Sequence, residues 1–140
     1  MPGVKSELPA RLTREHRDLD ELFGRFLAAV SEGDSETALA AIRFFDEALR
    51  RHTAFEEENA IPAPEGRRLV PNEAHDVDQE LGRELRLEHV QVREVSAMIL
   101  RLLAEKGDLE GARRLAPNLA RRWDAHTTRE ERELFRTLPY

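Results

Sequence analysis

Four of the five histidines in this 140-residue chain recur at nearly even intervals. They are His16, His52, His89 and His126, and successive members lie 36, 37 and 37 residues apart. Each falls on the apolar face of a segment whose hydrophobic residues recur every three or four positions, which is the period of an amphipathic helix. An imidazole that faces a protein interior can hydrogen-bond there or coordinate a metal ion.

Two glutamates, Glu56 and Glu130, lie four residues after the second and the fourth of these histidines. Residues four apart on a helix are separated by about 40° around its axis, so each glutamate shares the inward face of its histidine. The residue after it is turned by about 140° from the histidine. Glu57 and Glu131 are therefore predicted to point mostly away from the interior.

The hydrophobic periodicity predicts a single all-α domain over residues 1–140. Gly33 and Gly107 are predicted to end helices. Asp34 or Ser35 can cap the helix after Gly33, and Asp108 can cap the helix after Gly107. Pro117 predicts a kink or a short preceding helix in the last segment. The expected fold is an up-down-up-down antiparallel four-helix bundle. Its predicted helices cover about Pro9–Val30, about Glu36–Ala60, a start between Asn72 and Asp78 to about Glu105, and a last helix that reaches about Thr137.

The lengths of the helices predict that the histidines meet at one level. At 1.5 Å per residue, the chain climbs about 24 Å from the first histidine to the turn at Gly33 and about as far back to the second. The corresponding climbs on either side of Gly107 are about 27 Å. Four imidazoles and two carboxylates should therefore share one layer of the core. His75 precedes His89 by roughly 21 Å of helix and is expected to miss this layer.

A buried layer of this kind needs compensating positive charge. Without it, the burial of two carboxylates and four imidazoles would cost more than the net stability of a small domain. Nitrogen and oxygen donors suit iron, manganese or zinc, and carboxylates that can bridge favour a two-metal centre. The alternative interpretation is a structural bundle in which the histidines only hydrogen-bond, or which binds a single zinc ion.

Charge and composition restrict the partners of the chain. A net charge of −6 argues against nucleic acid, which needs a clustered basic face. The absence of cysteine excludes disulfides, iron–sulfur clusters and zinc–thiolate sites, and it fits a reducing cytoplasm. No apolar run approaches membrane-spanning length, and the N-terminus lacks the apolar core of a signal peptide. We expect a cytoplasmic protein that binds neither nucleic acid nor a membrane.

The combined pattern resembles the hemerythrin-like (HHE cation-binding) family. The residues that carry the resemblance are His16, His52-Thr-Ala-Phe-Glu56, His89, His126-Thr-Thr-Arg-Glu130, and the ending Leu134-Phe135 with Leu138-Pro139. The resemblance implies a bundle that holds two non-haem iron ions bridged by an oxo or hydroxo group and two carboxylates. It also implies how the ligands divide: His16 and His52 on one iron, His89 and His126 on the other, and Glu56 and Glu130 as bridges.

Two positions depart from the oxygen-carrying members of that family. Those carriers have a further histidine one turn before the third-helix ligand, where this chain has Leu85. They also use an aspartate five residues after the last histidine, whereas here Glu130 at four residues fits best. The resemblance therefore implies a centre with fewer histidines and more open coordination sites, similar to the branch linked to nitric oxide, peroxide or iron handling.

The function expected from the sequence is that of a non-haem di-iron protein. It would bind or react with oxygen, peroxide or nitric oxide in sensing, scavenging or weak redox activity, so its expected partner is a small diatomic gas or peroxide. The alternative is an oxygen or iron carrier or storage module without turnover. No separate acid–base or nucleophilic set accompanies the histidines in the sequence, and none of its motifs identifies a protein partner.

Overall fold

The structure, a computed structural model, describes residues 7–62 and 73–138, and for residues 73–78 it describes the backbone alone. The described part is helical and contains no strand. Its elements are α1 (Leu8–Glu32), α2 (Ser35–Asn59), α3 (Glu73–Lys106), α4 (Leu109–Arg129), the π-helical turn η2 (Glu130–Leu134) and the 3₁₀ turn η3 (Phe135–Thr137).

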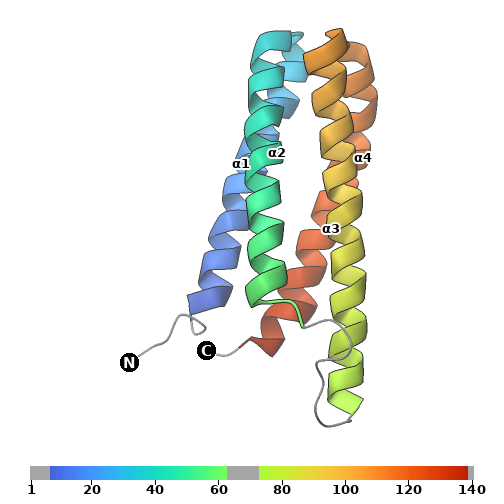
Figure 1. Cartoon of the computed structure of the whole chain (residues 1–140). Coiled ribbons are helices and arrows are strands. Elements are labelled where there is room, and N and C mark those ends of the chain that lie inside the picture. The colour runs from blue at the N-terminus through green and yellow to red at the C-terminus, as the bar shows by residue number, and fades with distance from the viewer. Residues whose placement is uncertain (1–6, 63–72, 139–140) are drawn as a thin grey trace.

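The helices form a bundle in which each one packs against two neighbours. Helix α1 lies beside α2 and α4, and α3 lies beside the same two helices. The α1–α2 turn and the α3–α4 turn lie at the same end of the bundle, so α1 with α2 and α3 with α4 make two hairpins packed side by side (Figure 1). This confirms the predicted all-α four-helix bundle.

Both hairpins turn on the same Gly-Asp pair, 74 residues apart. Gly33 has a φ of +74° and Gly107 a φ of +58°, in the left-handed region that favours glycine. The side chains of Asp34 and Asp108 each accept a hydrogen bond from the backbone N–H three residues on, at 3.1 and 2.8 Å. The predicted helix stops and caps are therefore confirmed, and the two turns repeat each other in structure.

The predicted bounds hold to within two residues, except in the last helix. There the α-helix ends at Arg129, and the wider π-helical turn η2 and the tighter 3₁₀ turn η3 continue the helical backbone to Thr137. Pro117 lies inside α4 and divides off no separate short helix. Ala116 and Leu119 are buried on either side of it, and their packing offsets the hydrogen bond that proline cannot make. His75 lies in the first turn of α3, and its side chain is outside the described residues.

The apolar core consists of two clusters, one at each side of the predicted histidine layer. The larger runs toward the Gly-Asp turns and contains Phe23, Phe26, Phe45 and Trp123, while the smaller contains Leu12, Leu85, Leu134 and Phe135. On α4, Ala112, Ala116 and Leu119 are buried, whereas Leu115 is half-buried. None of the helices is long and apolar enough to cross a membrane, as judged on the described residues.

Candidate metal centre

The six predicted residues lie together in one layer of the bundle. The four histidines expose 3% of their surface or less, and Glu56 and Glu130 expose none. The rings of His16 and His52 have centroids 4.9 Å apart in the first hairpin, and those of His89 and His126 are 4.7 Å apart in the second. The expectation that both hairpins deliver their histidines to one level is confirmed in this geometry.

Apolar side chains close the layer from both directions. On α1, for example, Leu12 one turn before His16 belongs to the smaller cluster and Leu19 after it belongs to the larger one. Trp123 on α4 and Leu134 on η2 flank the site residues in the same way. The polar layer is therefore enclosed by hydrophobic packing, in which an unpaired charge would be costly.

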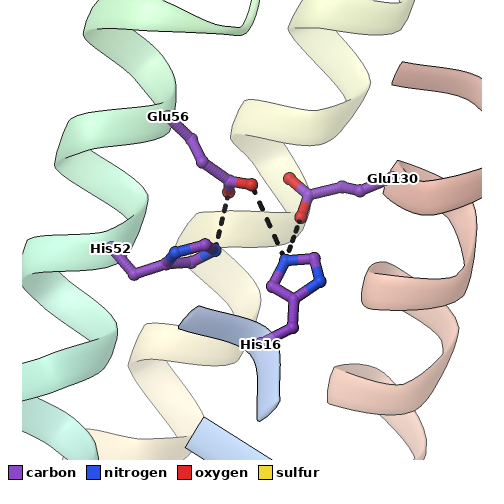
Figure 2. Close-up of side chains that lie close together, drawn as sticks. All are labelled: His16, His52, Glu56 and Glu130. Atoms are coloured by element: carbon purple, nitrogen blue, oxygen red, sulfur yellow. Dashed lines mark hydrogen bonds and ion pairs between the residues drawn. The ribbon is translucent and has the colours of Figure 1, made fainter. Parts of the chain in front are cut away.

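Each glutamate reaches histidines of both hairpins. Glu56 on α2 places Oε1 3.2 Å from His52 Nε2 and 3.0 Å from His89 Nε2, and its Oε2 lies 3.7 Å from His16 Nε2. Figure 2 shows the carboxylates of Glu56 and Glu130, which come from different helical segments, meeting at His16. The two carboxylates thus connect the hairpins at the centre of the bundle.

Glu130 makes the matching set of contacts from the other hairpin. Its Oε1 lies 3.0 Å from His16 Nε2, and its Oε2 lies 3.1 Å from His126 Nε2 and 3.3 Å from His89 Nε2. Both glutamates therefore touch a histidine of their own helix and histidines of other helices. This is the placement required of carboxylates that bridge two cations.

Two groups of potential ligand atoms result, and both groups contain both glutamates. Within each group, one potential ligand atom per residue lies within 4.8 Å of all the others. The groups are His16, His52, Glu56 and Glu130, and Glu56, His89, His126 and Glu130. Two imidazoles with shared carboxylates per group are a donor set that iron, manganese and zinc accept.

Several buried polar atoms in the layer lack a hydrogen-bond partner among the described residues. They include His52 Nε2, His126 Nε2 and Glu56 Oε2. His52 Nε2 lies at ion-pair distance from Glu56, yet the two atoms do not have hydrogen-bond geometry. Orphaned buried polar atoms normally cost about 1–3 kcal/mol each. Ligands of one cation point at the ion rather than at each other, so the orphaned atoms fit a metal site.

Charge balance in the metal-free layer depends on protons. Burial lowers the pKa of His16, but its contacts with Glu130 and Glu56 outweigh burial and raise the pKa to about 9. The same causes raise the pKa of His89 to about 10. Burial raises the pKa of Glu130, but contacts with three histidines outweigh it and hold the pKa well below its usual range. Imidazolium protons thus supply the positive charge that cations would supply in a metal-bound layer.

A second set of glutamates surrounds the layer and binds the outer nitrogens of the histidines. The Nδ1 atom of His52 donates to Glu15 at 2.6 Å, that of His89 to Glu57 at 2.7 Å, and that of His126 to Glu88 at 2.7 Å. Each contact runs from one helix to the next, from α1 to α2, α2 to α3 and α3 to α4. A carboxylate can only accept, so each Nδ1 carries the hydrogen and each Nε2 faces the centre.

The fourth member of this outer set is not engaged. Glu131 on η2 lies 3.9 Å from His16 Nδ1 on α1, too far for a hydrogen bond, and its side chain is 47% exposed. His16 Nδ1 has no hydrogen-bond partner among the described residues. The outer set therefore fixes three of the four imidazoles and leaves His16 the least constrained.

Two arginines hold members of the outer set, and they come from different helices. Arg11 on α1 binds Glu15 at 2.9 Å, whereas Arg129 on α4 binds Glu88 at 2.8 Å. Burial raises the pKa values of both glutamates, but the contacts with histidine and arginine outweigh burial and lower them. The two carboxylates stay charged and keep accepting from their histidines.

The backbone widens after Glu130, the inner glutamate of the second hairpin. The carbonyl of Glu130 accepts from the N–H of Phe135, five residues on. The carbonyl of Glu56, at the end of α2, accepts from the N–H groups of both Ala60 and Ile61 at 2.8 Å. Such wide turns are frequent at functional sites. The turn after Glu130 also places Phe135 against His16, with stacked ring centroids 5.7 Å apart.

The prediction for Glu57 was wrong, and that for Glu131 was nearer to the structure. Glu57 is half-buried and binds His89, because the neighbouring α3 lies within reach of a side chain turned partway from the interior. The sequence reasoning also missed Glu15 and Glu88 as partners of histidine. The available signal was the repeated pair Glu-His at 15–16 and 88–89 beside the repeated Glu-Glu at 56–57 and 130–131.

One comparison with known proteins bears on this site. The family model described as the hemerythrin HHE cation binding domain matches residues 2–64. Over these residues the chain is hemerythrin-like. The matched segment includes His16, His52 and Glu56, and it confirms the resemblance predicted from the sequence. Neither the curated proteins nor the solved structures gave a significant match.

The second hairpin lies outside the matched segment and carries the other half of the layer. Its His89, His126 and Glu130 repeat the spacing of the first hairpin and complete the second ligand group. The family match and the buried histidine–glutamate groups together indicate a metal-binding protein.

The metal-free chain should lose stability as the pH rises from 7 to 9.5. The folded-state pKa values of His16 and His89, about 9 and about 10, lie above the value of 6.5 expected when unfolded. Their stabilising contribution is therefore complete below about pH 6.5 and is lost as the pH passes through the folded values. Urea unfolding of the metal-free chain at several pH values measures this, and a flat profile would contradict it. The metal-loaded chain should show the opposite slope, because protons compete with cations for the same nitrogens.

Glu57→Gln should weaken metal binding by about tenfold to a hundredfold. The neutral amide replaces the charged carboxylate that accepts from Nδ1 of His89 and holds the ring in place. The measurement is the affinity for ferrous ion under anaerobic conditions. Glu58→Gln is the matched control, because Glu58 is the next residue, its side chain is exposed, and the substitution removes the same charge. Equal affinities of the two variants would show that Glu57 has no part in positioning His89.

Proposed function

We propose that this chain is a non-haem di-iron protein that binds or reacts with oxygen, peroxide or nitric oxide. The observation that carries the proposal is the pair of ligand groups that share both buried glutamates. In the proposed site, His16 and His52 hold one iron, His89 and His126 hold the other, and Glu56 and Glu130 bridge them. The family resemblance adds an oxo or hydroxo bridge between the irons.

The choice of iron rests on the donors and on the positions they leave open. Two imidazoles with a carboxylate, and open positions beside them, are typical of non-haem iron(II) sites. Thiolate ligands, which would favour structural zinc, are ruled out by the lack of cysteine. When bound, the iron pair would supply redox chemistry and open coordination positions for a small molecule. Manganese and zinc are less favoured occupants of the same donors.

The residues around the layer support a small and uncharged reactant. Phe135 stacks on His16, and the indole of Trp123 lies edge-on to the same ring at 5.7 Å. Leu85 and Leu134 are completely buried on the same side as Phe135. These walls exclude water from the centre, and molecules as small as oxygen, nitric oxide or hydrogen peroxide can reach it without bringing a charge into apolar surroundings. A cytoplasmic location, proposed from the lack of cysteine, fits these reactants.

Iron loading tests the proposal most directly. We expect about two irons per chain, oxo-to-iron charge transfer in the near ultraviolet, and quenching of the fluorescence of Trp123, the one tryptophan in the sequence. Its ring centroid lies 5.7 to 6.3 Å from those of three site histidines. Glu130→Gln should reduce the iron content, while Glu47→Gln, an exposed change of the same kind, should not. A stable, colourless chain that takes up no iron, or one zinc alone, would refute the proposal.

Reactivity separates a redox protein from a carrier. Reduced, iron-loaded chain is exposed anaerobically to nitric oxide or peroxide, or to oxygen, and the spectrum is followed. Repeated consumption of peroxide or nitric oxide supports scavenging, whereas a reversible spectral change without consumption supports a carrier. No spectral response to any of the three would refute both.

Leu85→His should slow the autoxidation of the reduced protein. Leu85 is completely buried one turn before His89 on α3, so a histidine there can add a nitrogen donor to the more open centre. The rate is measured from the optical spectrum after oxygen is admitted. Leu85→Met keeps the apolar side chain and is the control for disturbed packing. Equal rates in the histidine variant and the original chain would remove the link between ligand number and oxidation.

A further inference from the structure

A cavity of about 270 Å³ opens between α1 and α2 and reaches His52, one residue of the candidate centre. Its inner end is formed by His52, a proposed ligand, and by Glu15, which binds that histidine. Its walls are the apolar side chains of Leu19, Ala48 and Phe55. Two guanidinium groups, Arg11 and Arg51, and the carboxylate of Asp18 complete the lining.

The second hairpin carries arginines at two positions that correspond to the lining of this cavity. The repeat aligns Ala48 with Arg122 and Phe55 with Arg129, each 74 residues on. Arg129 lies across the equivalent of Glu15, since it binds Glu88 together with Glu84 and Glu133. A larger hollow of about 590 Å³ lies nearby, but neither Glu88 nor His126 is among its lining residues. Among the described residues, the lining of the cavity beside His52 thus differs from the residues at the aligned positions of the second hairpin.

The cavity has room because a small residue stands where the second hairpin has a long one. Ala48 leaves space that the arginine side chain would occupy at the aligned position, and Phe55 provides a flat apolar surface. The guanidinium of Arg11 lies 3.5 Å from the centroid of the Phe55 ring and also binds Glu15 at 2.9 Å. Arg11 is therefore held at the side of the cavity and leaves its interior open.

The lining defines the kind of molecule that fits. A cavity of about 270 Å³ lies just below the usual range of roughly 300–1,000 Å³ for ligand pockets, so it suits a single ring. The apolar walls suit the face of that ring. Arg51 binds Glu47 at 3.0 Å and is largely exposed, and its remaining N–H groups can donate to an anionic group on the ring. Glu15 and Asp18 can accept hydrogen bonds from hydroxyl groups. The matching class is a small hydroxylated aromatic acid.

A small hydroxylated aromatic acid could supply the electrons that repeated reduction of peroxide requires. The reduction of hydrogen peroxide to two waters takes two electrons and two protons, and the proposed pair of iron ions would supply the two electrons. A hydroquinone returns two electrons and releases two protons as it becomes a quinone. The sum is one peroxide and one hydroquinone giving two waters and one quinone, in which atoms and electrons balance. Repeated turnover therefore needs a donor of this class.

We propose that the cavity between α1 and α2 binds a small anionic hydroquinone, which passes electrons to the centre across the His52 imidazole. The electron-transfer part of this proposal rests on the proposed di-iron function. The binding part rests on the cavity alone and can be measured in the metal-free chain.

Binding is tested with 2,5-dihydroxyphenylacetate as the probe and the metal-free chain. Nuclear magnetic resonance titration should shift the amide signals around Ala48 and Leu19 in a saturable manner. Ala48→Met fills the cavity and should abolish these shifts. Ala40→Met adds the same side chain at an exposed position of the same helix and should leave them unchanged. Unchanged binding to Ala48→Met would overturn the proposal.

The anionic group is tested separately. Arg51→Gln should weaken binding of the probe by about tenfold, as expected for the loss of one charge-assisted contact. The same variant should bind methylhydroquinone, which lacks the carboxylate, as well as the original chain does. Equal losses for both molecules would show that Arg51 does not recognise the anion.

Electron transfer is tested with the ferric, iron-loaded chain. The rate of its reduction should saturate with the concentration of the probe, and Ala48→Met should make it at least about tenfold slower, while reduction by dithionite stays the same. Equal rates with the probe in both chains would overturn the role of the cavity. If the chain binds no iron, the proposed function fails by itself, and the titration of the metal-free chain still decides whether the cavity binds the ring.

Discussion

The pairing of two fully buried carboxylates with four buried imidazoles is the constraint on which this bundle depends. Glu56 and Glu130 expose no surface. Burial and the charge of Glu130 act to raise the pKa of Glu56, but its contacts with three histidines outweigh both and lower it. Two like charges are tolerable in an apolar interior only if positive charge lies between or beside them. Protons on His16 and His89 provide it in the metal-free chain, and cations would provide it in the metal-bound state proposed here. This requirement for charge balance explains why the six side chains lie together in one layer.

Duplication explains how one chain satisfies that constraint twice. A Glu-His pair, a Gly-Asp turn and a His-xxx-Glu-Glu motif make up each hairpin. Packed side by side, the hairpins place the inner glutamate of each against histidines of the other, and the outer glutamates support histidines on the next helix around the bundle. Neither hairpin alone brings together a complete ligand group. Folding of the whole bundle therefore assembles the candidate centre.

The departures from the repeat give the two sides different properties. In the first hairpin Arg11 lies over Phe55 and holds Glu15, while in the second Arg129 takes the place of the aromatic ring and holds Glu88. Both arrangements place a guanidinium beside an outer glutamate, and the first borders the cavity next to His52. His16 differs again, because Glu131 stays out of reach and Phe135 stacks on the ring instead. The centre is nearly symmetric in its donors and asymmetric in its surroundings.

The sequence by itself determined the helices, their turns and the six inward-facing residues of the layer. These follow from local periodicity, from the spacing of His52 and Glu56 on one helix, and from equal lengths of helix on either side of Gly33 and Gly107. Contacts between helices were decided by the tertiary structure: the outer role of Glu57, the arginine that holds Glu88, and the cavity beside His52. A position on a helix face fixes a side chain's direction to within one turn, but which partner it meets depends on the neighbouring helix packed against that face.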